Sequence, residues 1–133
     1  MRPLFAFLAV GAGGAIGSIL RYAVTIWMVG RVGPGFPWHT LLINLAGSFF
    51  IGAIAAYAQS SAGLSPYLSA FVMVGVLGGF TTFSTFSFDV LTLASEGAAG
   101  LAVAYCAGSV ILGISAAAAG IAVVRVAFHA ASG

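Results

Sequence analysis

The sequence predicts an all-α membrane protein with four transmembrane helices. Of its 133 residues, 62% are hydrophobic and only 5% are charged. A soluble domain of this size has about a quarter of its residues charged, so the solvent of this chain is expected to be lipid. Four apolar segments approach or exceed the length of about 17 to 25 residues that a bilayer requires, with Gly/Pro-rich or polar turns between them. These segments are residues 4–29, 41–57, 67–93 and 98–124.

The first segment, residues 4–29, could be taken for a signal peptide. Its apolar stretch is too long, no clear A-x-A cleavage site follows it, and three more spans come after it, so we expect a retained helix. Gly13 and Gly17 form a GxxxG motif here, as do Gly75 and Gly79 in the third segment. Such motifs let helices approach closely, and we expect them to pack between subunits.

A polar stripe marks the second segment, where Thr40, Asn44 and Ser48 recur at intervals of four and therefore share a helix face. Asn44 matters most, because an amide at membrane depth is costly unless it is paired. Its NH₂ group could donate to an anion, or its side chain could join two helices by a hydrogen bond. The sequence leaves both open. His39 borders this helix and is expected at the membrane interface.

The third segment contains the stretch GGFTTFS (78–84). As one helix, residues 66–93 would span about 42 Å, against a hydrocarbon core of about 30 Å. Paired glycines and adjacent threonines, whose hydroxyls compete for backbone partners, favour a break here. The carbonyls freed by a break need protein, water or an ion, and they suit a monovalent cation such as Na⁺. A continuous Ser/Thr-rich helix is the alternative.

Aromatic and hydroxyl side chains crowd the same region. Phe80 to Phe88 holds four phenylalanines and five hydroxyls. Phe83 and Phe86 are three apart and would share a face. Such pairs commonly serve packing, but the positive edge of a ring can also line a narrow anion path, where weak donors let an ion leave again.

The fourth segment carries a fainter polar face, formed by Tyr105 and Ser109 and continued by Gly113. Ordinary interface packing would also explain it. Cys106 is the single cysteine, which excludes an internal disulfide, and we interpret it as a buried hydrophobic residue. A net charge of +2 is too small and scattered for nucleic-acid binding.

The four arginines are evenly divided between the two ends of the predicted bundle. Arg2 and Arg125 belong to the end that holds both termini, whereas Arg31, with Arg21 near the end of helix one, belongs to the other. Orientation follows the excess of Lys and Arg in short loops, so the sequence predicts insertion both ways up and antiparallel pairing of two copies. A small hidden bias is the alternative.

Few other side chains inside the membrane are ionisable. Arg21 is expected at the edge of the hydrocarbon, where it snorkels to the interface or attracts anions to a vestibule. Asp89 and Glu96 fall toward the end of the third segment and in the following turn. The main alternative function, a proton-coupled exporter of cationic drugs, needs a membrane-embedded carboxylate, and the other three segments contain none. A non-conducting structural subunit is a further alternative.

Three stretches resemble the CrcB/Fluc family of fluoride channels: GAGGAIGSILRY (11–22), HTLLINLAGSFFIG (39–52) and GGFTTFSTFSFDV (78–90). The resemblance covers all four helices. It implies a multi-pass protein of the cell inner membrane that exports F⁻ passively and catalyses no reaction. It also implies a four-helix subunit with a broken third helix, an antiparallel dual-topology homodimer, two fluoride pathways and a central Na⁺.

The resemblance further implies roles for single residues. The backbone carbonyls of Gly78 and Thr81 would hold Na⁺, and the rings of Phe83 and Phe86 would contact the anion. The other implied positions are Asn44, Ser84, Thr85, Tyr105, Ser109 and Thr40 along the anion pathway, with Arg21 in a vestibule. Two departures stand out, because His39 replaces the usual glycine of the helix-two opening and Gly113 replaces the serine of some relatives.

Overall fold

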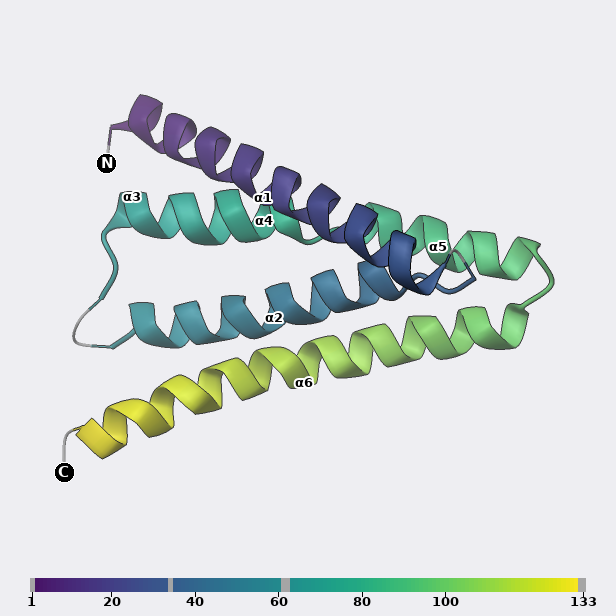
Figure 1. Cartoon of the computed structure of the whole chain (residues 1–133). Coiled ribbons are helices and arrows are strands. Elements are labelled where there is room, and N and C mark those ends of the chain that lie inside the picture. The colour runs from purple at the N-terminus through teal and green to yellow at the C-terminus, as the bar shows by residue number, and fades with distance from the viewer. Residues whose placement is uncertain (1, 34, 61–62, 132–133) are drawn as a thin grey trace.

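The computed structural model describes residues 2–33, 35–60 and 63–131 as helices joined by short turns (Figure 1). Pro34 and residues 61–62, in two of the predicted turns, lie outside the described residues. Four stretches are long and apolar enough to cross a membrane, so the prediction of an all-α chain with four such helices is confirmed. They are α1 (Pro3–Val32), α2 (Trp38–Ala58), the composite segment Pro66–Ser95, and α6 (Ala99–Ala131).

The composite third segment is not one regular helix. It comprises α3 (Pro66–Ser69), the π-helix η1 (Ala70–Leu77), α4 (Gly78–Phe80) and α5 (Phe83–Ser95). The side chain of Ser65 caps its start by accepting a hydrogen bond from the Leu68 N–H at 3.2 Å. The π-helical turn pattern was not predicted, because a continuous apolar run has the same composition in an α-helix and in a π-helix.

Between α4 and α5 the backbone leaves the helical conformation at two residues. Thr81 has φ −78° and ψ 158°, and Thr82 has φ −152° and ψ 115°. The last helical bond before them runs from the Thr81 N–H to the Leu77 carbonyl at 3.0 Å, and the Thr81 hydroxyl donates to the same carbonyl at 2.9 Å. The interruption therefore lies inside the GGFTTFS stretch, directly after its two glycines and its first phenylalanine.

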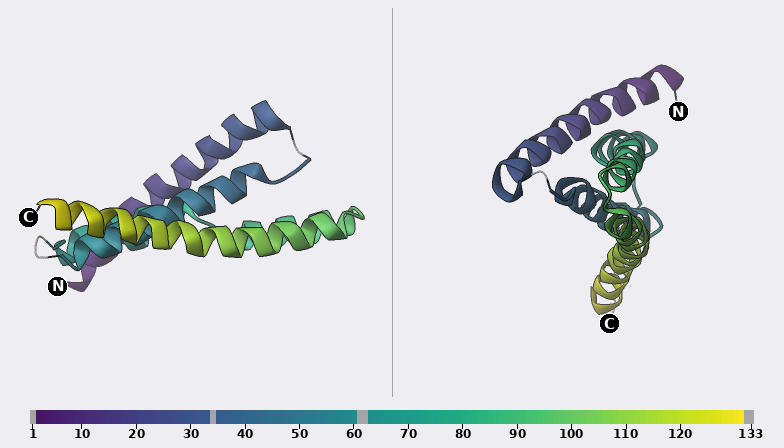
Figure 2. Two further views of the ribbon diagram at one scale, coloured as in Figure 1. Left: turned by 90° about the horizontal axis from the view of Figure 1, so that it is seen from below. Right: turned by 90° about the vertical axis from the view of Figure 1, so that its right-hand side faces the viewer.

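The helices are arranged as two closely packed pairs. α1 packs on η1 and α4, α2 packs along α6, and α5 reaches α6 beyond the interruption. The two termini and the α2–α3 connection lie at one end of the molecule, and the α1–α2 and α5–α6 connections lie at the other (Figure 1). Viewed end-on, the arrangement is open, with α1 and the C-terminal part of α6 at opposite edges (Figure 2).

Glycines bring α1 against the third segment within one subunit. A Cβ atom added at Gly13 would overlap the backbone carbonyl of Phe71, and one at Gly75 would lie 2.9 Å from the Cα of Gly13. Gly17 and Gly79 are in equally tight contact with backbone atoms across this interface. The expectation that these motifs pack between subunits is therefore wrong, because the two motifs lie on neighbouring helices of the same chain and face each other.

The subunit buries few of its apolar side chains. The fully buried hydrophobic residues are Met28, Ile43, Leu77, Phe86, Leu93, Ala102 and Tyr105. Most large apolar side chains instead point outward, including Phe83, which is 79% exposed. Apolar patches of this extent are foreign to the surface of a soluble monomer, and helices satisfy their own backbone groups in lipid. The chain is therefore a multi-pass membrane protein.

The contrast between two adjacent glycines provides a test of the α1 packing. Gly13→Ala should lower the free energy of unfolding by about 1–3 kcal/mol, because its methyl group meets backbone that cannot yield locally. Gly14→Ala is the matched control, since a Cβ there meets open space, and it should leave stability unchanged or raise it through helix propensity. Thermal unfolding in detergent measures both. Equal melting temperatures for the two variants would contradict this packing.

Candidate functional site

The site is built around a reciprocal hydrogen-bond pair between α2 and the interruption. The Asn44 Nδ2 donates to the Thr82 carbonyl at 3.1 Å, and the Thr82 N–H donates to the Asn44 Oδ1 at 2.9 Å. This pairing fixes which end of the amide is oxygen, because only one orientation matches a donor and an acceptor on the same backbone residue. Of the two roles open for Asn44, the structure assigns the one in which its side chain joins α2 to the third segment. One of the two Nδ2 hydrogens is not used in this pair.

The interruption diverts the usual helical hydrogen-bond donors of two carbonyls to side chains. In a continuous helix the Gly78 carbonyl would accept from the Thr82 N–H, and the Thr81 carbonyl from the Thr85 N–H. The first donor is instead bonded to Asn44, and the second donates to the Thr82 Oγ1 at 3.2 Å. Gly78 and Thr81, the two positions implied for Na⁺, are thus the carbonyls whose helical donors are demonstrably diverted.

Thr82 is a residue of this site that the sequence reasoning missed. Its hydroxyl caps the start of α5, donates to the Thr85 Oγ1 at 3.0 Å, and lies 3.3 Å from the Ser84 Oγ. The signal was present, because threonine is a preferred N-cap residue before a new helix. The two hydroxyls predicted for the anion pathway, Ser84 and Thr85, are therefore both linked to the residue that Asn44 holds.

Arg21 lies within α1 rather than at its end, and its Nε donates to the Gly79 carbonyl at 3.1 Å. The expectation that Arg21 lies near the end of helix one is therefore wrong, and its guanidinium bonds within the subunit. The physical reason is that the interruption removes the helical donor of Gly79, the Phe83 N–H, and a guanidinium is a strong replacement. Arg21 borders a polar cavity of about 260 Å³, here called the Arg21 cavity. Its other polar lining residues are Ser18, Tyr22, Thr25, His39, Thr40, Thr82 and Thr85.

A second cavity of about 350 Å³, here called the Asn44 cavity, lies between α2, α6 and the third segment. It is lined by the interruption residues Thr81 and Thr82, by Asn44, and by the aromatic pair Phe83 and Phe86, whose ring centroids are 5.6 Å apart. Ser109 is also part of its lining. Thr82 borders both cavities. Of the implied anion-pathway residues, Ser84 and Tyr105 line neither of them.

Tyr105 belongs to the hydrophobic cluster between α5 and α6 and is 3% exposed. Its hydroxyl donates to the Asp89 Oδ2 at 3.3 Å. The hydroxyls of Thr40 and Ser109 lie beside it, yet both are buried without a hydrogen-bond partner among the described residues. Buried polar groups are nearly always paired, and the Tyr105 hydroxyl lies close enough to both to interact with them.

Comparison with known proteins identifies the family. The model of the family described as "CrcB-like protein, Camphor Resistance (CrcB)" matches residues 8–121. This chain belongs to the CrcB family. The match extends from the first span into the fourth and includes every residue of the two cavities.

Several related proteins have names that state an activity. The "Fluoride-specific ion channel FluC" of Rhizobium meliloti is 49% identical over 118 residues, which cover 89% of this chain and 94% of the relative. The protein of the same name from Agrobacterium fabrum is 45% identical, with coverage of 87% and 93%. That of Thermus thermophilus is 47% identical, with coverage of 81% and 84%.

The two departures noted in the CrcB-like motifs lie next to the site without disrupting it. His39 is half-buried and lines the Arg21 cavity, so a ring occupies space that glycine would leave open. A Cβ at Gly113 would lie 3.7 Å from the Ser48 Oγ, which is ordinary contact. This position therefore has room for a serine and brings α6 close to the polar stripe of α2.

The Asn44–Thr82 pair generates a stability prediction. Asn44→Ala leaves the Thr82 N–H and carbonyl without their partner, at a cost of about 1–3 kcal/mol for each unpaired group. Ser48→Ala is the matched control, because Ser48 lies one turn further along the same face and lines the same cavity without bonding to the interruption. Thermal unfolding and amide hydrogen exchange at Thr82 measure the effect. Unchanged exchange at Thr82 in Asn44→Ala would refute the role assigned to the pair.

Proposed function

We propose that this chain is a fluoride-selective channel that conducts F⁻ passively out of the cytoplasm, across the inner membrane, and so reduces fluoride toxicity. The relatives named fluoride-specific ion channels, which are 45–49% identical over most of the chain, carry this proposal. The site supports it independently, because it offers hydrogen-bond donors and ring edges. No catalysis is required.

Selectivity for F⁻ requires replacement of a tightly held hydration shell. The donors on offer are the remaining Nδ2 hydrogen of Asn44, the hydroxyls near Thr82, and the buried hydroxyls of Thr40 and Ser109. The edges of the Phe83 and Phe86 rings add weak positive charge without a fixed cation. Weak, repeated contacts let an ion enter and leave, whereas Arg21 raises the local anion concentration from the neighbouring cavity.

Na⁺ fits the carbonyls of Gly78 and Thr81. Hard cations prefer oxygen ligands, and backbone carbonyls at unwound helix ends bind Na⁺ in membrane transporters. Among the described residues no cluster of His, Cys, Asp or Glu could hold a metal, so carbonyls are the donor set on offer. Bound Na⁺ would supply a fixed positive charge at the interruption. The chain's own part is to keep these two oxygens free of hydrogen-bond donors.

A second, antiparallel copy would complete the site. Two carbonyls from one subunit leave a hard cation short of ligands, and the Phe83 ring of the pathway is 79% exposed in the single subunit. Because Arg21 lies within α1, it no longer counts toward either end of the bundle. One end then carries two arginines, Arg2 and Arg125, and the other end carries one, Arg31. So small a difference directs insertion weakly. An antiparallel homodimer in both membrane orientations is consistent with these charges.

Ion flux from liposomes tests the proposed function. Purified protein should release F⁻ rapidly and Cl⁻ far more slowly. Phe83→Ile should slow F⁻ efflux by about tenfold, equivalent to about 1.4 kcal/mol in the barrier, because it removes a ring edge from the pathway. Phe88→Ile is the matched control, since Phe88 is 69% exposed on the same helix but lines neither cavity. Chloride efflux as fast as fluoride efflux would sink the proposal.

The antiparallel pair and its Na⁺ predict two further measurements. With Cys106→Ser and Ala98→Cys, a membrane-impermeant maleimide should label about half of the protein in intact spheroplasts and all of it after lysis, because orientation is mixed. Labelling of all or none would indicate one orientation.

The Na⁺ site predicts stabilisation by Na⁺ in detergent. The melting temperature should be higher in Na⁺ than in N-methylglucamine. At a hundredfold excess of Na⁺ over its dissociation constant, the free energy of unfolding should rise by about 2.7 kcal/mol. Equal melting temperatures would argue against a Na⁺ site.

A further inference from the structure

The connection between α1 and α2 places an aromatic ring against the α5–α6 cluster. The Phe36 ring meets the Tyr105 ring edge-to-face, with centroids 5.3 Å apart and planes at 81°. On another side, the Phe86 ring lies 5.4 Å from Tyr105. Phe36 packs against the cluster to which Leu93 and Ala102 also belong. A residue far from the interruption in sequence is thereby joined to the aromatic pair that lines the Asn44 cavity.

The backbone holds Phe36 in this place. Pro37 is buried and has φ −78° and ψ 56°, the conformation of an inverse γ-turn, and the Trp38 N–H donates to the Phe36 carbonyl at 2.8 Å. Proline is suited to this turn because its ring restricts φ to this range. The centroid of the Trp38 ring, two residues further along the chain, lies 4.5 Å from that of the Phe36 ring. Phe36 is thus positioned by a defined turn at the beginning of α2.

The Tyr105 hydroxyl depends on this ring packing for its position. Its hydrogen bond to Asp89, at 3.3 Å, is long for an O–H···O bond, whose usual distance is about 2.7–2.8 Å. The ring, by contrast, is 3% exposed and bounded by Phe36 and Phe86. Loss of the Phe36 ring would let the tyrosine ring move and carry its hydroxyl away from Thr40 and Ser109.

We propose that Phe36 is a positioning residue for Tyr105: its ring holds the Tyr105 hydroxyl beside those of Thr40 and Ser109, and so tunes anion passage without touching the ion. The inference deepens the proposed function and rests on it for the role of Tyr105 in the anion pathway. On this proposal the connection between α1 and α2 also positions a side chain of the anion pathway, besides joining the two helices.

A double-mutant cycle on F⁻ efflux from liposomes tests the proposal. Phe36→Ala should slow efflux by about two- to tenfold, the range that corresponds to an aromatic pair. Tyr105→Phe removes the hydroxyl but keeps the ring. In that background Phe36→Ala should have little further effect, because no hydroxyl remains to be positioned. Non-additivity of this kind identifies coupled residues.

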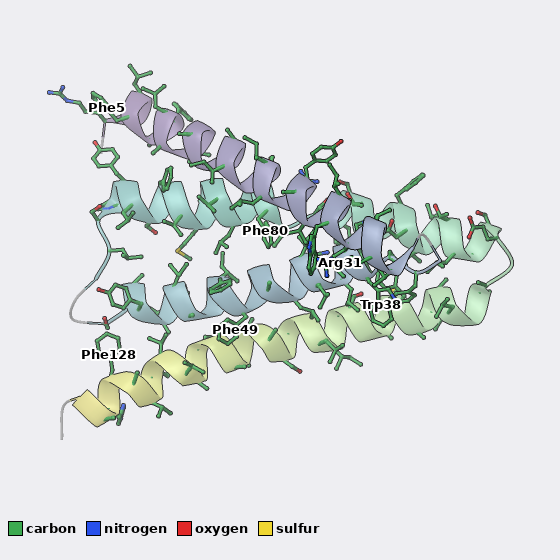
Figure 3. All side chains as sticks on the ribbon, viewed as in Figure 1. Phe5, Arg31, Trp38, Phe49, Phe80 and Phe128 are labelled. Carbon is green, nitrogen blue, oxygen red and sulfur yellow. The ribbon has the colours of Figure 1, made fainter. Side chains whose placement is uncertain are left out.

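Two results of the cycle would overturn the proposal. Wild-type efflux in Phe36→Ala would show that the ring does not matter. An equal slowing by Phe36→Ala with and without the Tyr105 hydroxyl would show a merely structural role. Phe128→Ala is the matched control, since it breaks the contact with Tyr57 near the C-terminal end, opposite the end where Trp38 lies (Figure 3), and it should leave efflux unchanged. If Phe36→Ala does not fold, Phe36→Leu replaces it in the cycle.

A measurement independent of flux separates this inference from the proposed function. In protein labelled with 3-fluorotyrosine, the four tyrosines give ¹⁹F signals that Tyr→Phe variants assign. Phe36→Ala should shift or broaden the Tyr105 signal and spare that of Tyr57, and Phe128→Ala should do the reverse. If wild-type protein carries no F⁻, the channel proposal fails while this contact is still decided. An unchanged Tyr105 signal in Phe36→Ala would overturn the positioning role.

Discussion

The reciprocal pairing of Asn44 with Thr82 is the interaction on which the rest of the site depends. An extended residue inside an apolar segment exposes an N–H and a carbonyl that lipid cannot satisfy. One amide side chain provides the complementary donor and acceptor at 3.1 and 2.9 Å. Two other side chains share the task, because Arg21 bonds to the Gly79 carbonyl and the Thr82 hydroxyl caps α5. The interruption is thus supported from α1, from α2 and from within.

This support explains why functional groups can remain free nearby. The Asn44 and Thr82 side chains take the N–H groups that would otherwise bond to the Gly78 and Thr81 carbonyls. A continuous helix of the same sequence would bury those oxygens in its own hydrogen bonds. The structural role found for Asn44 is therefore compatible with a role in function. Its hydrogen bonds to Thr82 leave nearby carbonyl oxygens without helical donors inside an apolar protein.

The sequence predicted what composition and spacing determine, and missed what depends on partners distant in the chain. The four apolar helices follow from hydrophobic segment lengths, and the stripe from Thr40 to Ser48 from helical periodicity. By contrast, the contact of Arg21 with Gly79 joins residues 58 positions apart, and no local pattern encodes it. The glycine motifs were recognised, but Gly13 was assigned to the wrong interface, because a motif shows that a close approach exists and does not identify the partner helix.

The same distinction separates the inner and outer parts of the subunit. Backbone groups at the interruption find their partners inside one chain, whereas Phe83 stands 79% exposed although its neighbour Phe86 is buried in the α5–α6 cluster. Lipid would accept an exposed phenylalanine without cost, so exposure alone does not demand a partner. The Thr40 and Ser109 hydroxyls, which lack a hydrogen-bond partner in the part of the chain that the structure describes, differ, because a buried hydroxyl without a hydrogen bond is destabilising in any apolar surrounding. The need for an ion or for water therefore arises from the polar groups around the interruption and not from the apolar surface.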